Sequence, residues 1–135
     1  MPQRRFLITG GSQGIGAALA EQAAAAGHAV VVTGRDPRRL ADVASRTGVH
    51  AVQADVARGD DNARVVADCV ARMGGVDVLI NNAGYAYRAE IGAMDVDAMR
   101  TMFETNVFGL MDLTNRVVPL MKTQADGDIV NVAST

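Results

Sequence analysis

Five short apolar segments alternate with four longer segments of helical periodicity along this chain of 135 residues. The middle of the second segment, Val30-Val31-Val32, has no polar alternation, which is typical of a parallel strand covered on both faces. Strands that alternate with helical crossovers predict a parallel sheet between two layers of helices. The five predicted strands are residues 6–8, 29–33, 49–54, 76–80 and 128–132.

Right-handed crossovers, with the chain reversing its direction across the sheet after the first strand, predict the strand order 3-2-1-4-5. We therefore expect an α/β fold, a Rossmann-type doubly wound parallel sheet that occupies residues 1–135 as one domain. In such sheets a ligand binds outside the carboxyl ends of the strands, at the point where the strand order reverses.

Apolar periodicity also predicts which helix faces are buried. In the first helix the inward face is predicted to hold Ile15, Leu19, Ala23 and Ala26. In the third helix, residues 60–73, it is predicted to hold Val65, Val66, Cys69 and Val70.

The last predicted helix is long, and Asp95 is placed to cap its start. Pro119 is expected to kink or loosen its end. Its predicted apolar stripe consists of Val96, Met99, Phe103, Val107, Leu110, Met111, Thr114 and Val118.

Composition excludes several classes of protein. The net charge is only −2, so nothing electrostatic favours nucleic acid or a membrane surface as a partner. The single cysteine, Cys69, cannot form an internal disulfide or a metal site alone, and we expect it to be a small buried apolar residue. The sequence shows neither a signal peptide nor an apolar run of membrane-spanning length, which predicts a cytoplasmic protein.

A glycine-rich turn, residues 9–16 (TGGSQGIG), joins the first strand to the first helix. Gly10 permits a tight turn with a positive φ, Gly14 allows close approach of a pyrophosphate, and Gly16 allows close packing of the helix. Amide groups at the start of a helix, together with the helix dipole, favour an anion. The turn therefore predicts nucleotide binding, and the alternative is a glycine-rich turn without a ligand.

The spacing Thr-Gly-x3-Gly-x-Gly resembles the signature of the short-chain dehydrogenase/reductase family. Four further segments match this family in its order along the chain, so the resemblance covers the whole sequence. These segments are Asp55-Val56, Asn81-Asn82-Ala83-Gly84, Asn106 and Ser134. The resemblance implies an NAD(P)(H)-dependent oxidoreductase that interconverts a small alcohol and a carbonyl compound by hydride transfer, with homo-oligomers common in the family.

The resemblance also assigns roles to the matched residues. Ser134 is expected to hold the substrate oxygen and Asn106 to position a water in a proton relay; otherwise, Ser134 is a plain strand-end serine and the Asn106 amide caps backbone at a helix bend. Asp55 is expected to accept from the adenine amino group, although it could equally cap the backbone before Ala57. The residues expected to bind the cofactor are Thr9, Gly10, Ser12, Gln13, Gly14, Ile15, Gly16, Arg35, Asp55, Val56, Asn82, Ala83 and Gly84.

The choice of cofactor depends on the end of the second strand. An acidic side chain there would bind the ribose hydroxyls and repel a 2′-phosphate, but Gly34 occupies the position and Arg35 follows. A guanidinium can grip a phosphate through two hydrogen bonds. The sequence therefore favours NADP(H). NAD(H) remains the alternative, because Asp36 could either turn towards the ribose or pair with Arg39.

The catalytic tyrosine of this family is followed four residues later by a lysine, and these 135 residues contain no such pair. The only tyrosines are Tyr85 and Tyr87, and the only lysine is Lys122. We expect the chain to be the N-terminal, cofactor-binding part of a longer reductase, ending after the fifth strand and inactive alone. The alternative is a non-catalytic nucleotide-binding module or half of a split enzyme. The loop after Gly84 is expected to face solvent, and the alternative is that Tyr85, Tyr87 and Arg88 border the substrate pocket.

Overall fold

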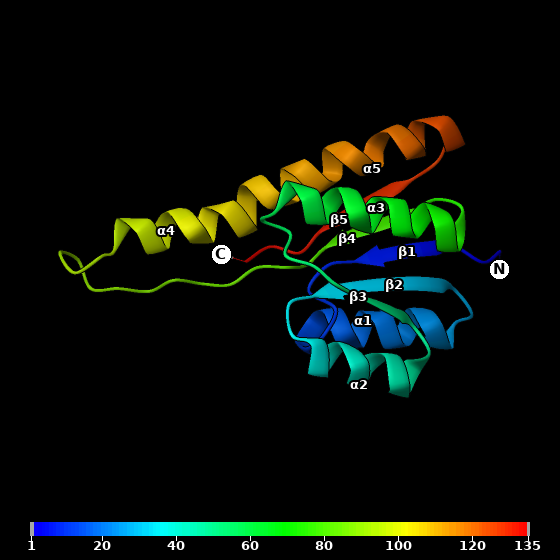
Figure 1. Cartoon of the computed structure of the whole chain (residues 1–135), viewed down its shortest axis with the longest axis horizontal. Helices are drawn as coiled ribbons and strands as arrows, with labels where there is room; N and C mark the ends of the chain where they lie inside the picture. The colour runs from blue at the N-terminus through cyan, green and yellow to red at the C-terminus, as the bar shows by residue number, and fades with distance from the viewer. Residues whose placement is uncertain (1, 135) are drawn as a thin grey trace.

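The computed structural model describes residues 2–134 and has the predicted parallel sheet (Figure 1). Its order is β3-β2-β1-β4-β5, and all four strand pairings are parallel. Both the α/β class and the order 3-2-1-4-5 are therefore confirmed. The strands are β1 (Arg5–Ile8), β2 (Ala29–Gly34), β3 (His50–Gln53), β4 (Val78–Asn81) and β5 (Asp128–Asn131).

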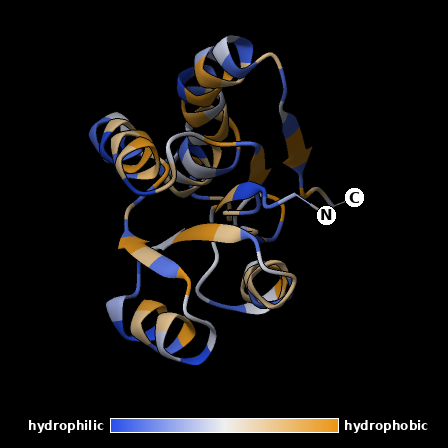
Figure 2. Cartoon of the chain, turned by 90° about the vertical axis from the view of Figure 1, so that its right-hand side faces the viewer, coloured by the Kyte–Doolittle hydropathy of each residue, from blue (hydrophilic) through white to orange (hydrophobic). Residues whose placement is uncertain are grey.

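Helices cover the sheet on two sides: α1 and α2 lie below it in Figure 1, and α3 and α5 lie above it. Figure 2 shows the apolar strands between these two layers. The segment before α4, and α4 itself, extend beyond the carboxyl ends of the strands (Figure 1). The helices are α1 (Gly14–Ala25), α2 (Pro37–Thr47), α3 (Gly59–Met73), α4 (Val96–Phe103), the π-helix η1 (Glu104–Gly109) and α5 (Leu110–Gln124).

The core has two halves because successive residues of a strand point to opposite faces of the sheet. On β1, Leu7 joins the cluster beneath α3 and α5, whereas Ile8 joins the cluster beneath α1 and α2. On β4, Leu79 and Ile80 divide in the same way. Fully apolar strands are therefore explained by burial on both faces.

The predicted inward face of α1 is wrong at two of its four positions. Ile15 is 62% exposed and Ala26 is also exposed, while Gly16, Ala20 and Ala23 form the buried face. Small residues on this face let the helix lie close to the strands.

The predicted inward face of α3 is correct at Val65 and Cys69, which are buried, but Val70 is 41% exposed. The same face also buries a polar residue, Asn62. Cys69 is fully buried, as the sequence predicts, and this burial raises the pKa of its thiol to about 12.

The predicted single helix of residues 96–118 is interrupted, and its predicted stripe is wrong. η1 adds residues to one turn and shifts the helical phase between α4 and α5, so the buried residues of α5 are Leu113, Val117 and Met121. Pro119 lies inside α5, which continues to Gln124, and the expected kink or loosening there stays a prediction. The cap at Asp95 is confirmed, since its carboxylate accepts from two backbone amides. Exposed members of the predicted stripe include Val96, Phe103, Val107 and Met111.

None of the helices within residues 2–134 is long and apolar enough to cross a membrane.

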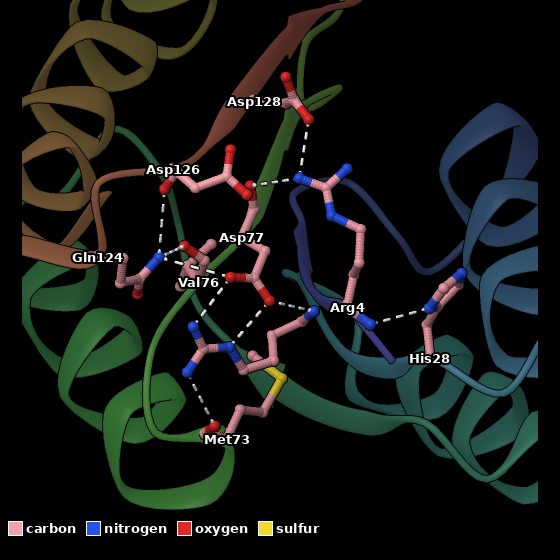
Figure 3. A network of polar contacts seen from close by, with 9 residues as sticks. Arg4, His28, Met73, Val76, Asp77, Gln124, Asp126 and Asp128 are labelled. Carbon is pink, nitrogen blue, oxygen red and sulfur yellow. Dashed lines mark hydrogen bonds and ion pairs between the residues drawn. The ribbon is translucent and has the colours of Figure 1, made fainter. Parts of the chain in front are cut away.

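Charged groups join the amino ends of β1, β4 and β5 (Figure 3). The Asp77 carboxylate accepts from the Arg5 backbone N at 2.9 Å, from its Nε at 2.9 Å and from its Nη2 at 2.8 Å. These bonds to Arg5 lower the pKa of Asp77, and the same pair raises the pKa of Arg5. The side chains are only 26% and 18% exposed, whereas the neighbouring pair of Arg4 and Asp128 includes a carboxylate that is 60% exposed.

We predict that Asp77→Asn lowers the free energy of unfolding at pH 7 by about 1.5–3 kcal/mol, the range for hydrogen bonds to a charged group. A folded-state pKa below the unfolded value stabilises the protein above about pH 4, and this contribution is lost as the pH falls further. Urea denaturation at several pH values measures this effect. The difference in the free energy of unfolding between the variant and the original protein should become smaller towards pH 3.

The matched control is Asp128→Asn, which removes the more exposed carboxylate of the same network. We expect this substitution to change the free energy of unfolding by no more than about 0.5 kcal/mol. An equal cost for both variants, or a gap for Asp77→Asn that does not change with pH, would contradict this assignment.

Candidate cofactor-binding groove

A groove of about 350 Å³ lies at the carboxyl ends of the strands, where the strand order reverses between β1 and β4. This is the position predicted from the fold. The residues that line it come from the turn after β1, the ends of β2, β3 and β4, and η1. They are Gly10, Ser12, Gln13, Ile15, Thr33, Gly34, Arg35, Asp36, Arg39, Ala54, Asp55, Val56, Asn82, Ala83, Gly84, Tyr85 and Thr105.

The turn after β1 is built on close approaches that a side chain would prevent. Gly10 has φ +62°, as predicted, and a Cβ on Gly16 would lie 2.2 Å from the Gly10 carbonyl oxygen. Gly16 therefore packs α1 against the turn itself. The side chain of Gln13 does not cap the first amides of α1, and that of Arg58 does not cap α3, whereas Asp36 and Asp95 cap α2 and α4. The uncapped start of α1 forms one wall of the groove.

Thr9 and Asn82 join this turn to the end of β4. The buried Thr9 hydroxyl oxygen accepts from the backbone amides of Asn82 and Ala83 at 3.1 and 3.0 Å. In return, Asn82 Nδ2 donates to the Gly10 carbonyl at 3.1 Å. Thr9 thus supports the groove from beneath, while Asn82 both supports and lines it.

Asp55 caps backbone and also lines the groove. Its Oδ1 accepts from Ala57 N at 2.9 Å, which is the capping role that the sequence left open. The Asp55 backbone amide in turn donates to Asp61, and this bond lowers the pKa of the Asp61 carboxyl. The loop after β3 is therefore held in place, with the Asp55 side chain at the groove wall.

The Val56 carbonyl, also in this loop, is contacted from both α3 and η1. Asn62 Nδ2 donates to it at 2.9 Å, and the same nitrogen donates to Asp112 on α5 at 2.9 Å. The bond from Asn62, with that from Arg116, lowers the pKa of Asp112. A Cβ on Gly109 would lie 2.5 Å from the Val56 oxygen, so η1 approaches the loop at a glycine.

Asn106, in η1, binds the backbone of the residue that follows Gly84. Its Oδ1 accepts from Tyr85 N at 3.1 Å, and its Nδ2 donates to Tyr85 O at 2.7 Å. Both ends of the amide therefore contact backbone, which matches the capping alternative that the sequence left open. Thr105, beside it, is buried and lines the groove.

A basic cluster of Arg35, Arg38 and Arg39 follows β2, and Arg35 and Arg39 differ in their partners. Arg39 pairs with Asp36 and donates to the Gln13 side chain. The Asp36 carboxylate also caps α2 by accepting from the amides of Arg38 and Arg39. It is therefore paired with Arg39, which is one of the two possibilities that the sequence left open for it. The Arg35 guanidinium instead lies over the Tyr85 ring, with Cζ 6.0 Å from the centroid. Within residues 2–134 no carboxylate forms an ion pair with Arg35.

Ten of the predicted site residues line the groove, and five do not. Thr9, Gly14 and Gly16 belong to the turn, Asn106 lies behind Tyr85, and Ser134 is exposed after β5. Tyr85, in the loop after Gly84 that was predicted to face solvent, is 38% exposed and also lines the groove. Other lining residues that were not predicted are Thr33, Arg39, Ala54 and Thr105. Strand-end position marks Thr33 and Ala54, but no sequence signal marks Arg39.

The comparison with known proteins agrees with this architecture. A family described as short chain dehydrogenase matches residues 4–135. An oxidoreductase of Staphylococcus saprophyticus is 37% identical over 134 residues, which cover 95% of this chain and 57% of the relative. A 3-oxoacyl-acyl-carrier-protein reductase of Staphylococcus epidermidis is 34% identical, with coverage of 95% and 55%.

Solved structures show the same likeness. The crystal structure of a short-chain dehydrogenase from Streptomyces avermitilis has a TM-score of 0.91 and 37% identity, covering 98% of this chain and 49% of that protein. The chain thus spans about half the length of the relatives that it matches. The sequence match and the shared fold agree, and the chain belongs to the short-chain dehydrogenase family.

Proposed function

We propose that this chain binds NADP(H) in the groove and forms the cofactor-binding part of an oxidoreductase that interconverts an alcohol and a carbonyl compound. One observation carries the proposal. The uncapped start of α1, the Gly10 turn and Arg35 all line the same groove. Family membership adds that NAD(P) binding is general to such proteins. The 3-oxoacyl-acyl-carrier-protein reductase among the relatives supports a substrate with a carbonyl group.

The groove residues fit a dinucleotide. Amides at the start of α1 are suited to a pyrophosphate. Gly14 beside them has φ +55°, and a Cβ added there would meet no atom within 4 Å, so the space beside this turn is open. When bound, the nicotinamide supplies or accepts the hydride. We assign the adenosine to the wall formed by Asp55, Val56 and Ala83, and the remaining predicted contacts to Ser12, Gln13, Ile15, Asn82 and Gly84.

Two features support NADP(H) over NAD(H). Gly34 supplies no acidic side chain at the end of β2 that would bind the ribose hydroxyls, and a Cβ there would lie 2.9 Å from Ser12 Oγ. Arg35, which follows, has no carboxylate to neutralise it within the described residues, whereas Arg39 is paired with Asp36. We assign the 2′-phosphate to Arg35 because a guanidinium binds phosphate through two parallel hydrogen bonds.

We predict that Arg35→Met weakens NADPH binding roughly ten- to hundredfold, corresponding to a charged hydrogen bond of about 1.5–3 kcal/mol. NADH binding should change little, since NADH lacks the phosphate. Isothermal titration calorimetry with each cofactor measures both values. Arg38→Met is the matched control, because Arg38 lies in the same basic cluster but not in the groove. An equal loss for NADPH and NADH would contradict the role of Arg35.

The substrate side of the reaction involves Asn106 and Ser134 in our proposal. Ser134 follows β5 at the same edge of the sheet and would hold the substrate oxygen, while Asn106 would position water in the proton relay. The Tyr-x3-Lys pair of the family is not among these 135 residues. We therefore propose that the catalytic acid and base belong to a longer, homo-oligomeric protein. A binding module or split enzyme remains the second candidate for the same reason.

We predict negligible turnover by the 135-residue chain, because general acid–base groups typically contribute about 10²–10⁴-fold to such rates. The measurement follows NADPH oxidation in the presence of a simple ketone at several protein concentrations. A background rate that does not depend on protein concentration is expected. A rate that rises in proportion to the chain, and that Ser134→Ala abolishes, would contradict the prediction.

A further inference from the structure

We infer that Tyr85 is a positioning residue for cofactor specificity, whose ring holds the Arg35 guanidinium at the adenosine end of the groove. The inference rests on the proposed function, since it concerns how Arg35 comes to recognise a 2′-phosphate. Tyr85 lines the groove and so does Arg35. The two residues follow β4 and β2, which lie on opposite sides of β1. Their contact therefore spans the groove above the turn that follows β1.

The capacity of Arg35 to bind a phosphate depends on the kind of group that holds its guanidinium. A carboxylate would neutralise the guanidinium and occupy its N–H groups, as Asp36 does to Arg39. The face of an aromatic ring attracts the cation but leaves the N–H groups at the edge free. With Cζ 6.0 Å from the centroid, Tyr85 can restrain Arg35 without reducing its capacity to bind phosphate.

Both residues are anchored through their backbones. The Asn106 amide binds Tyr85 N and Tyr85 O, which fixes the backbone that carries the ring. Gln53 Nε2 donates to the Arg35 carbonyl at 3.3 Å, which ties the end of β2 to β3. The two backbones are therefore held in place, and the ring is the contact that restrains the exposed Arg35 side chain before a ligand binds.

The test compares two substitutions at this position by calorimetric titration with NADPH and with NADH. Tyr85→Leu removes the aromatic face, and we expect the preference for NADPH over NADH to fall about two- to fivefold, the range for an exposed cation–π contact. Tyr85→Phe keeps the face and should keep the preference. Tyr87→Leu is the matched control, because Tyr87 lies in the same loop outside the groove and its hydroxyl accepts from Asp95 N.

The outcomes separate this inference from the proposed function. If the unsubstituted chain binds neither cofactor, or binds both equally, the proposed function fails and the inference fails with it. If that chain prefers NADPH, and Arg35→Met abolishes the preference while Tyr85→Leu leaves it unchanged, only the inference is overturned. A rise in affinity for both cofactors with Tyr85→Leu would show that the ring obstructs the groove and would also overturn it. Circular dichroism spectra verify that each variant is folded.

Discussion

The groove depends on the contact between the turn after β1 and the start of the loop after β4. Gly16 brings α1 against the Gly10 carbonyl, and Thr9 and Asn82 bond the turn to the neighbouring strand end. Because β1 is the central strand, these contacts fix the point at which the strand order reverses. The ends of β2 and β3 then reach the same groove from one side, and Tyr85 with η1 reaches it from the other.

The inner strands β2 and β4 were predictable because a strand buried on both faces leaves an apolar run. β5 is exposed in this chain but still carries apolar residues, and the strand order followed from the handedness of the crossovers. The buried faces of the helices were less predictable. Alanine and glycine carry little apolar contrast, so the buried face of α1 at Gly16 and Ala20 could not be distinguished from one that includes Ile15. In residues 96–118 several apolar stripes are available, and η1 changes the phase between them. A turn of π-helix has no simple sequence signature.

For the site, residues at strand ends were predictable because the fold itself brings them to one edge. The side chains and backbone groups that these residues contact were not predictable. Asn62 is buried only because Val56 and Asp112, the latter 50 residues away, accept its hydrogen bonds. The same is true of Asn106, whose amide finds the Tyr85 backbone, and of Arg35, which meets the Tyr85 ring rather than a neighbouring carboxylate. Such pairings arise from tertiary contacts and not from spacing.

Occupation of the groove at the carboxyl ends of the strands by the cofactor can be tested by an NMR titration of the uniformly ¹⁵N-labelled chain with NADPH. We predict that amide resonances of residues 10–16, Arg35, Val56 and Gly84 shift together with one saturation curve, while those around Arg5 and Asp77 at the opposite end of the strands do not. Shifts centred at that opposite end, or no shifts at saturating NADPH, would contradict it.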